Sequence, residues 1–474
     1  GYSDGEQHYL PVLSNRELVT NTLPITLTEK GSKEFDLTKL FVGKDGKSFF
    51  DKNGKLAKNA DDVKLTIEYT NNPSWLMIQA LPSLSNPTND DNAISLIAAI
   101  YSNSIARHIM QSSPVIKQVV GLWKKEQASN GSFASAVSGK TSSLMSSLEK
   151  NQELKNIVLN ETPWVMDADK ESEQKAALVN YFDESLNANR LSSQIAKLKT
   201  LQNADGSFSW WKGMTGSRYM TTAVAKMMVR LNKMVGNQTE TASMLTSTFN
   251  YLQREAANEV KQMKKEETRL ANVRPSEAAV EYLYVLALDG RKQSTAASAD
   301  VNYLVNKMAD RTCEFTIYGK AQASVVLAKF GKTQKASEYL QSINEYSVST
   351  PEMGRYFDTR KAYYSWRDYK IPTQVAAIEA IKALPGQTGQ AMLEAKQTIT
   401  EMQLWLLQSK RTQAWDTPIN TVDAVYAFLD GNVQILNKTV ENASLKLDDK
   451  ALDLPKATAG LGYVKIAKQG SAKT

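Results

Sequence analysis

The chain has 474 residues, of which 42% are hydrophobic and 23% charged, so a globular protein of two or three domains is expected. Its 13 Pro and 23 Gly are few for this length, which disfavours an all-β array with many turns. The 57 basic residues outnumber the 50 acidic ones, but runs such as residues 261–267 mix both signs, as solvated helix faces do. Nucleic acid is therefore not expected as a partner.

The cysteine and histidine content restricts the chemistry. A single cysteine, Cys313, excludes an intrachain disulfide, and with no histidine nearby it is predicted to be a buried, inert packing residue. His8 and His108 are far apart in the sequence, so no metal site is expected. Motifs for phosphate binding, nucleophilic hydrolysis and zinc proteolysis are missing from the sequence, so no cofactor and no catalytic residue are predicted. No apolar run is long enough to cross a membrane.

The N-terminal part is predicted to be a linker over residues 1–15, followed by one part of a β-sandwich over residues 16–90. The chain begins without an initiator Met, and it is expected to be a segment of a longer polypeptide. Apolar and polar residues alternate over residues 63–69, which predicts a half-buried strand. The alternation of Leu76, Ile78 and Ala80 predicts that a second strand follows.

Helical periods dominate residues 91–430, where roughly a dozen helices are predicted. Short breaks containing glycine, at residues 289–290, 330–331 and 385–386, separate them and favour antiparallel helix pairs. Residues 347–371 are irregular and aromatic and are expected to contain a small hairpin.

Residues 431–474 return to β patterns, with candidate strands at residues 433–436, 445–447 and 463–466. Each of the two β parts is too short to bury a core by itself. The simplest arrangement is therefore a helical domain inserted into a β-sandwich that both chain ends complete.

One stretch carries a family resemblance. It runs from Asn72-Pro73-Ser74-Trp75 through Leu81-Pro82 to Asn103-Ser104-Ile105-Ala106, and it resembles the beginning of the thioester domain of alpha-2-macroglobulin-family proteins. In bacterial members a Cys-x-Glu-Gln thioester is expected at the start of the helix in this stretch, where this chain has Asn92-Ala93-Ile94-Ser95. No glutamine lies between Gln79 and Gln111, and the one cysteine is elsewhere. The resemblance therefore implies a thioester scaffold without its reactive bond.

Three aromatic motifs support the resemblance. The sequence from Leu201-Gln202 through Asp205-Gly206 to Trp210-Trp211 is similar to the repeat turns of terpene cyclases and thioester domains. Gly354-Arg355-Tyr356-Phe357 with Trp366, and the stretch from Gln413 through Trp415 to Asp423, also resemble the family. In the last stretch, Asn420 and Thr421 are expected to cap the final helix, with Asp423 in its first turn.

These motifs have two interpretations. In the favoured one, their aromatic side chains and the Gln202 amide hold helix ends together. In the other, they form an aromatic face that binds a ligand. The candidate residues for such a face are Trp210, Trp211, Tyr356, Trp366 and Trp415.

The resemblance implies a mainly α fold, an α/α toroid of about a dozen helices inserted into a partial β-sandwich. It also implies a fragment of a protease-inhibiting trap of the bacterial cell envelope, periplasmic or secreted and lipid-anchored through another part. Proteases and neighbouring β-domains of the same polypeptide would be its partners, and without the thioester there would be no covalent capture.

Two alternatives remain open. One is a carbohydrate lyase or hydrolase on the same toroid, which should show a deep groove with two carboxylates about 5–10 Å apart. The other is a non-catalytic interaction module of the envelope. A protonating terpene cyclase is disfavoured, because the only Asp-x-Asp, Asp167-Ala168-Asp169, is followed by Lys170 where an acid is needed.

Overall fold

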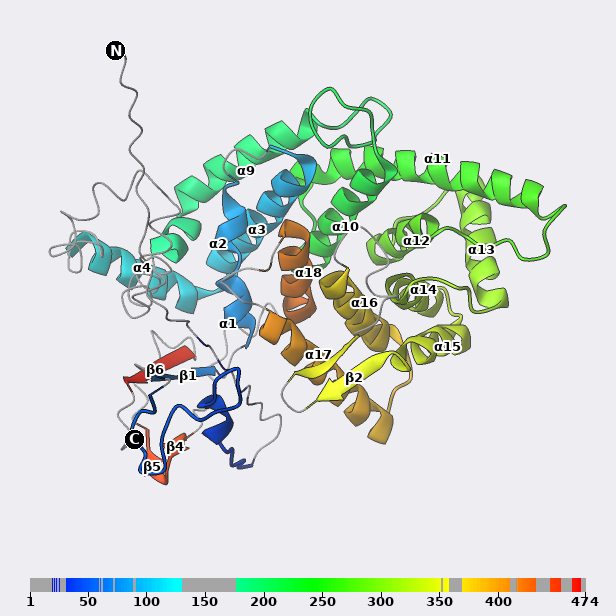
Figure 1. The fold of residues 1–474 in the computed structure, drawn as a ribbon. Coiled ribbons are helices and arrows are strands. Elements are labelled where there is room, and N and C mark those ends of the chain that lie inside the picture. Colours follow the sequence, from blue (N-terminus) through cyan, green and yellow to red (C-terminus); the bar gives the residue numbers. More distant parts are fainter. Residues whose placement is uncertain are drawn as a thin grey trace, which may run out of the picture.

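The computed structural model describes residues 31–58, 63–70, 73–87, 91–129, 176–350, 353–357, 369–409, 417–431, 444–452 and 463–469, with the single residues 19, 21, 23, 25, 60 and 415. This part of the chain is mainly helical (Figure 1). Its α-helices are α1 (Pro73–Ile78), α2 (Pro82–Ser85), α3 (Ala93–Ser112), α4 (Pro114–Ser129), α9 (Glu184–Lys199), α10 (Arg218–Val235), α11 (Ala242–Glu266), α12 (Glu277–Asp289), α13 (Thr295–Asp310), α14 (Ile317–Lys329), α15 (Thr333–Asn344), α16 (Lys370–Ala383), α17 (Gly389–Ser409) and α18 (Pro418–Leu429).

Six of these helices contact one another in a closed ring. Helix α3 packs on α10, α10 on α12, α12 on α14, α14 on α16, α16 on α18, and α18 returns to α3. The remaining long helices lie outside this ring, with α4 and α9 on α3, α11 on α10, α13 on α11 and α14, α15 on α14, and α17 on α16 (Figure 1). In the sequence, ring helices alternate with outer helices from α9 to α18, and sequential pairs such as α10–α11, α14–α15 and α16–α17 pack on each other.

Burial explains which helices form the ring. Every residue from Ile371 to Ile381 of α16 is buried, and α14 and α18 are buried nearly all round. A helix that is apolar on all sides needs neighbours on all sides. The outer helix α11 instead buries one stripe, including Leu245, Phe249, Leu252 and Ala256, and leaves its charged face exposed.

Local signals set several helix ends. The Ser276 side chain accepts a hydrogen bond from the Ala279 N–H at the start of α12, and Gly290 ends that helix with φ +69°. The predicted cap of the last helix is wrong, because Thr417 caps α18 and Pro418 is its first residue. Asn420 and Thr421 lie inside α18 and are buried.

Three two-stranded antiparallel sheets are described. Strand β1 (Lys64–Thr70) pairs with β6 (Tyr463–Gln469) in the register Ile67↔Ile466, which joins a segment before the helices to one after them. Strands β2 (Ser347–Thr350) and β3 (Gly354–Phe357) form the expected hairpin, and β4 (Lys446–Leu447) pairs with β5 (Lys450–Ala451). The strands predicted at residues 63–69, 445–447 and 463–466 are thus present.

The second N-terminal strand is a wrong prediction, because residues 73–78 form helix α1. Trp75, Met77 and Ile78 are all buried, so buried side chains do not alternate with exposed ones in this segment. The alternation of apolar residues in the sequence therefore does not indicate a strand here. Between residues 31 and 58 the chain forms turns, the 3₁₀ helix Thr38–Leu40 and isolated bridges instead of long strands. The predicted linker at residues 1–15 and the strand at residues 433–436 lie outside the described residues.

Candidate functional site

The four residues at the predicted thioester position form the cap and first turn of α3. The Asn92 Oδ1 atom accepts a hydrogen bond from the Ser95 N–H at 2.9 Å, and the Asn92 Nδ2 atom lies 3.2 Å from the Ser95 Oγ atom. Ala93 and Ile94 are buried, 0% and 6% exposed. The helix therefore starts where the prediction places it. These side chains supply neither a thiol nor a carboxamide three residues after it, so this turn cannot form an internal thioester.

A backbone contact joins this turn to the first aromatic motif. The Ala93 N–H donates a hydrogen bond to the Trp210 carbonyl oxygen at 3.1 Å. The Trp210 ring stacks with Trp211, with centroids 6.0 Å apart, and with Tyr219, with centroids 6.2 Å apart. The fold thus places an aromatic stack beside the start of α3. Tyr219 was not among the predicted residues; an aromatic residue two positions after the Ser217 cap of α10 was the available signal.

The first aromatic motif contains a clasp between its turn and α11. The Gln202 Nε2 atom donates to the Met244 carbonyl oxygen at 2.9 Å and to the Thr248 Oγ1 atom at 3.1 Å. Gly206, with φ +90°, allows close approach, because a Cβ atom there would lie 2.1 Å from the Ser247 carbonyl oxygen. The predicted contact between the glutamine amide and backbone groups is therefore present.

Burial separates the two tryptophans of this motif. Trp210 is partly buried and packs against the core, whereas Trp211 is 51% exposed. A mainly structural role, as predicted for both, does not fit Trp211. About half of its side chain is covered, and the other half leaves an aromatic surface in solvent.

The remaining candidate aromatics contact α17. The Tyr356 ring stacks on Trp405 with centroids 6.0 Å apart and an interplanar angle of 12°. Trp415 is 5% exposed, and its Nε1 atom donates to the Leu406 carbonyl oxygen at 3.1 Å. Packing of this kind agrees with the structural interpretation. Trp366 lies outside the described residues, and Trp405 was missed because nothing in its own helical run distinguishes it.

The centre of the ring holds a buried ionic cluster that the motif search did not find. Arg230 of α10 is 2% exposed; its Nη1 atom lies 2.6 Å from the Asp423 Oδ1 atom and its Nη2 atom 2.8 Å from the Glu379 Oε2 atom. Its Nε atom donates to the Tyr284 hydroxyl at 3.0 Å, and the Tyr426 ring covers the guanidinium at 4.3 Å. One arginine thus links α10 to α12, α16 and α18.

Electrostatic effects at this cluster follow from its burial. Loss of solvation acts to lower the pKa of Arg230, but the carboxylates of Glu379 and Asp423 outweigh this effect and raise the pKa well above its usual value. Burial also raises the pKa of Tyr284 well above that of a free phenol, so this side chain stays neutral and donates to Glu379. The cluster is a fixed arrangement of charges with its partners already in place.

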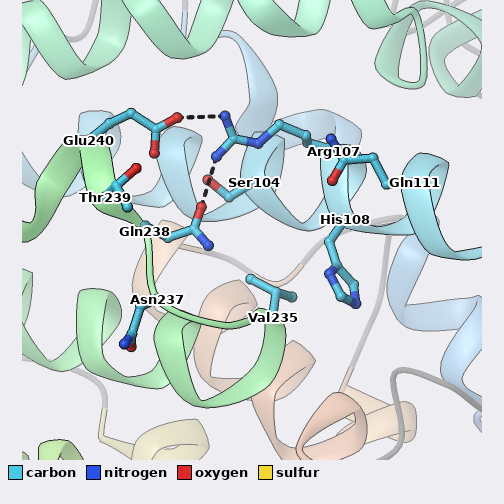
Figure 2. A pocket seen from close by; sticks show the side chains of 9 residues that line it. All are labelled: Ser104, Arg107, His108, Gln111, Val235, Asn237, Gln238, Thr239 and Glu240. Atoms are coloured by element: carbon cyan, nitrogen blue, oxygen red, sulfur yellow. Dashed lines mark hydrogen bonds and ion pairs between the residues drawn. The ribbon is translucent and has the colours of Figure 1, made fainter.

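A shallow pocket of about 240 Å³ lies where α3 and α10 end (Figure 2). Its Arg107 guanidinium pairs with the Glu240 carboxylate at 2.8 Å and donates to the Gln238 Oε1 atom at 2.9 Å. Burial lowers the pKa of His108, which favours its neutral form. Since both charged groups of this pocket are paired with each other, it offers no unbalanced charge to a ligand.

The described residues contain no group of three or more His, Cys, Asp or Glu placed to hold a metal ion. They also contain no helix long and apolar enough to cross a membrane.

The one cysteine, Cys313, lies just before α14 and is 3% exposed. Its backbone N–H donates a hydrogen bond to the Tyr339 hydroxyl at 2.9 Å. The predicted burial of this thiol is confirmed, and it belongs to a different part of the ring from the start of α3.

Comparison with known proteins gives no assignment: no protein-family model matches the chain, and a search of curated proteins finds no significant match.

Proposed function

We propose that the chain is the thioester-domain-like part of a bacterial alpha-2-macroglobulin-type protease trap, and that it takes part in trapping without forming a covalent bond. The observation that carries this proposal is the start of α3. A capped turn, Asn92 to Ser95, stands where the resemblance requires a thioester, and the Trp210 backbone lies against it.

The proposal also includes an interpretation of the fold. We interpret the six ring helices and their outer partners as an α/α toroid. The β1–β6 pair, formed by segments on either side of the helices, would then be part of a β-sandwich into which the toroid is inserted. Neighbouring β-domains of a longer polypeptide would complete that sandwich. A periplasmic or cell-envelope location, with a lipid anchor in another part, follows from the same resemblance.

The ring centre favours this proposal over a carbohydrate-cleaving enzyme. Such an enzyme needs two carboxylates that face each other across an open groove. Here Glu379 and Asp423 both bind Arg230, and all three side chains are at most 7% exposed. An arginine side chain thus occupies the space between the two acids, where a sugar would have to bind.

The proposal is tested by incubating the longer polypeptide that contains this chain with a set of endopeptidases of different specificity. The expected result is that a protease elutes with the polypeptide under native conditions and separates from it completely in denaturing electrophoresis. No co-elution with any protease, while the polypeptide is cleaved, would contradict the trap. A conjugate that survives denaturation would contradict its non-covalent nature.

A further inference from the structure

Two exposed apolar residues lie on one turn that follows Trp210, the residue bonded to the start of α3. Trp211 is 51% exposed and Met214 is 48% exposed. The Met214 N–H donates to the Trp211 carbonyl oxygen at 3.2 Å, and Gly213 adopts φ +86° inside the turn. These features define a tight turn of the backbone that carries both side chains.

The base of this turn is anchored on both sides. Before it, the Trp210 carbonyl oxygen binds the Ala93 N–H of α3. After it, Gly216 packs so closely that a Cβ atom there would lie 1.9 Å from the Ser207 Oγ atom. Because the backbone is fixed and Trp210 stacks on one side of Trp211, little conformational entropy remains to be lost when the exposed side binds a ligand.

We propose that the exposed indole face of Trp211, with Met214 on the same turn, binds a hexopyranose ring of an uncharged oligosaccharide by stacking. The face of an aromatic ring carries partial negative charge, which complements the weakly positive C–H groups on the flat face of a sugar. The sugar hydroxyls, which point outwards from its ring, stay in water or reach polar groups of the turn such as Lys212 and Thr215, both exposed.

The size of the exposed surface argues against a protein partner or a membrane. Half of one indole and half of one methionine side chain amount to roughly 200 Å², whereas a stable protein interface buries about 800 Å² on each side. Membrane-surface binding needs a larger apolar face with several cations around it. A single sugar ring matches the area that the turn offers.

Charge argues against nucleic acid as the ligand of this turn, and backbone geometry argues against an extended peptide. Bound nucleic acid needs a basic groove along its phosphates, but Lys212 is the one cation in the turn, and the nearby Arg218 pairs with Glu259 at 2.8 Å. An extended peptide needs a strand edge or a groove. Around Trp211 the described residues offer only the isolated bridges of Phe208 with Gln202 and Ser217.

This inference does not depend on the proposed trap, so each can fail without the other. Cellohexaose and chitohexaose are titrated into the protein by isothermal titration calorimetry, because the heat of binding does not depend on Trp211 as a reporter. The expected result is saturable binding of at least one of them, weakened about tenfold or more by Trp211→Ala and largely retained by Trp211→Phe. Leu270→Ala is the matched control, because Leu270 is 59% exposed but lies in another loop.

Each outcome of this titration supports or contradicts the inference. Unchanged melting temperatures of the variants ensure that a lost signal reports binding and not unfolding. If neither saccharide binds up to about 10 mM, or if Trp211→Ala binds as well as the parent, the inference is overturned. It is likewise overturned if Trp211→Ala instead abolishes self-association in sedimentation velocity, or binding to phosphatidylglycerol vesicles, while no saccharide binds.

Discussion

The substitution Arg230→Met removes the cation that pairs with both Glu379 and Asp423 at the centre of the helix ring. Methionine keeps much of the side-chain length, but it leaves two carboxylates, 7% and 1% exposed, without this partner. Breaking a buried ion pair by removing one partner costs about 3–5 kcal/mol, because the remaining charge is still buried. If roughly 300 residues unfold together, that loss lowers the melting temperature by about 5–8 °C.

The assay is thermal and denaturant unfolding of Arg230→Met beside two comparison variants. Arg107→Met breaks the exposed pair with Glu240 and should cost at most about 1 kcal/mol. The triple variant Arg230→Met, Glu379→Gln, Asp423→Asn removes all three charges and should recover part of the lost stability. If Arg230→Met melts within about 1 °C of the parent, or if Arg107→Met costs as much, the ionic cluster does not hold the ring together.

Three further predictions address packing and pH. Trp415→Ala should cost about 3–5 kcal/mol because the side chain is 5% exposed, whereas Trp211→Ala should leave the melting temperature nearly unchanged; equal losses would contradict the structural role of Trp415. Gly354→Ala should destabilise clearly more than Gly386→Ala in chemical denaturation: both have positive φ, but only at Gly354 would a Cβ atom meet backbone, 2.2 Å from the Glu401 carbonyl oxygen. Burial raises the pKa of several phenols above the usual 10.0, so their contribution to stability is complete below pH 10 and is lost as the pH rises through the raised values. These phenols belong to Tyr101, Tyr181, Tyr284, Tyr318 and Tyr426. Their ionisation, followed by ultraviolet absorbance, should coincide with alkaline unfolding followed by circular dichroism, and ionisation of all five in the still folded protein would refute the burial.

The sequence predicts the local structure well where one signal dominates. The cap at Ser276 and the glycine at position 290 give both ends of α12, and the alternation over residues 63–69 gives β1. It fails where two patterns look alike. In residues 73–78 apolar side chains are buried on both sides, so a short helix reads as a strand, and at α18 the cap lies at Thr417, three residues before the expected pair.

The candidate functional site, like the fold, could be predicted only where a local sequence motif marks it. The start of α3 and the tryptophans beside it carry local motifs, and α3 begins at the expected residues, but the contact of Trp210 with this turn was not predicted. The ionic cluster has no local motif, because Arg230 is separated from its two acids by 149 and 193 residues. A single sequence shows which face of a helix is apolar but not which helices meet. The usable signal was a charged residue within an otherwise apolar helical run, as at Arg230, Glu379 and Asp423, because such a charge needs a partner when buried.

The most direct test of the central claim is amine incorporation at the start of α3, measured by intact mass and thiol titration. In a thioester, methylamine attacks the acyl carbon, forms an amide and releases the cysteine thiol. The parent chain should gain neither mass nor a reactive thiol. The variant Asn92→Cys, Ile94→Glu, Ser95→Gln restores the Cys-x-Glu-Gln pattern at the same turn; it should lose one ammonia on forming the thioester, then take up one methylamine and expose one thiol. An amine adduct on the parent, or a folded variant that neither loses ammonia nor takes up the amine, would contradict the claim that this turn is a thioester site without its bond.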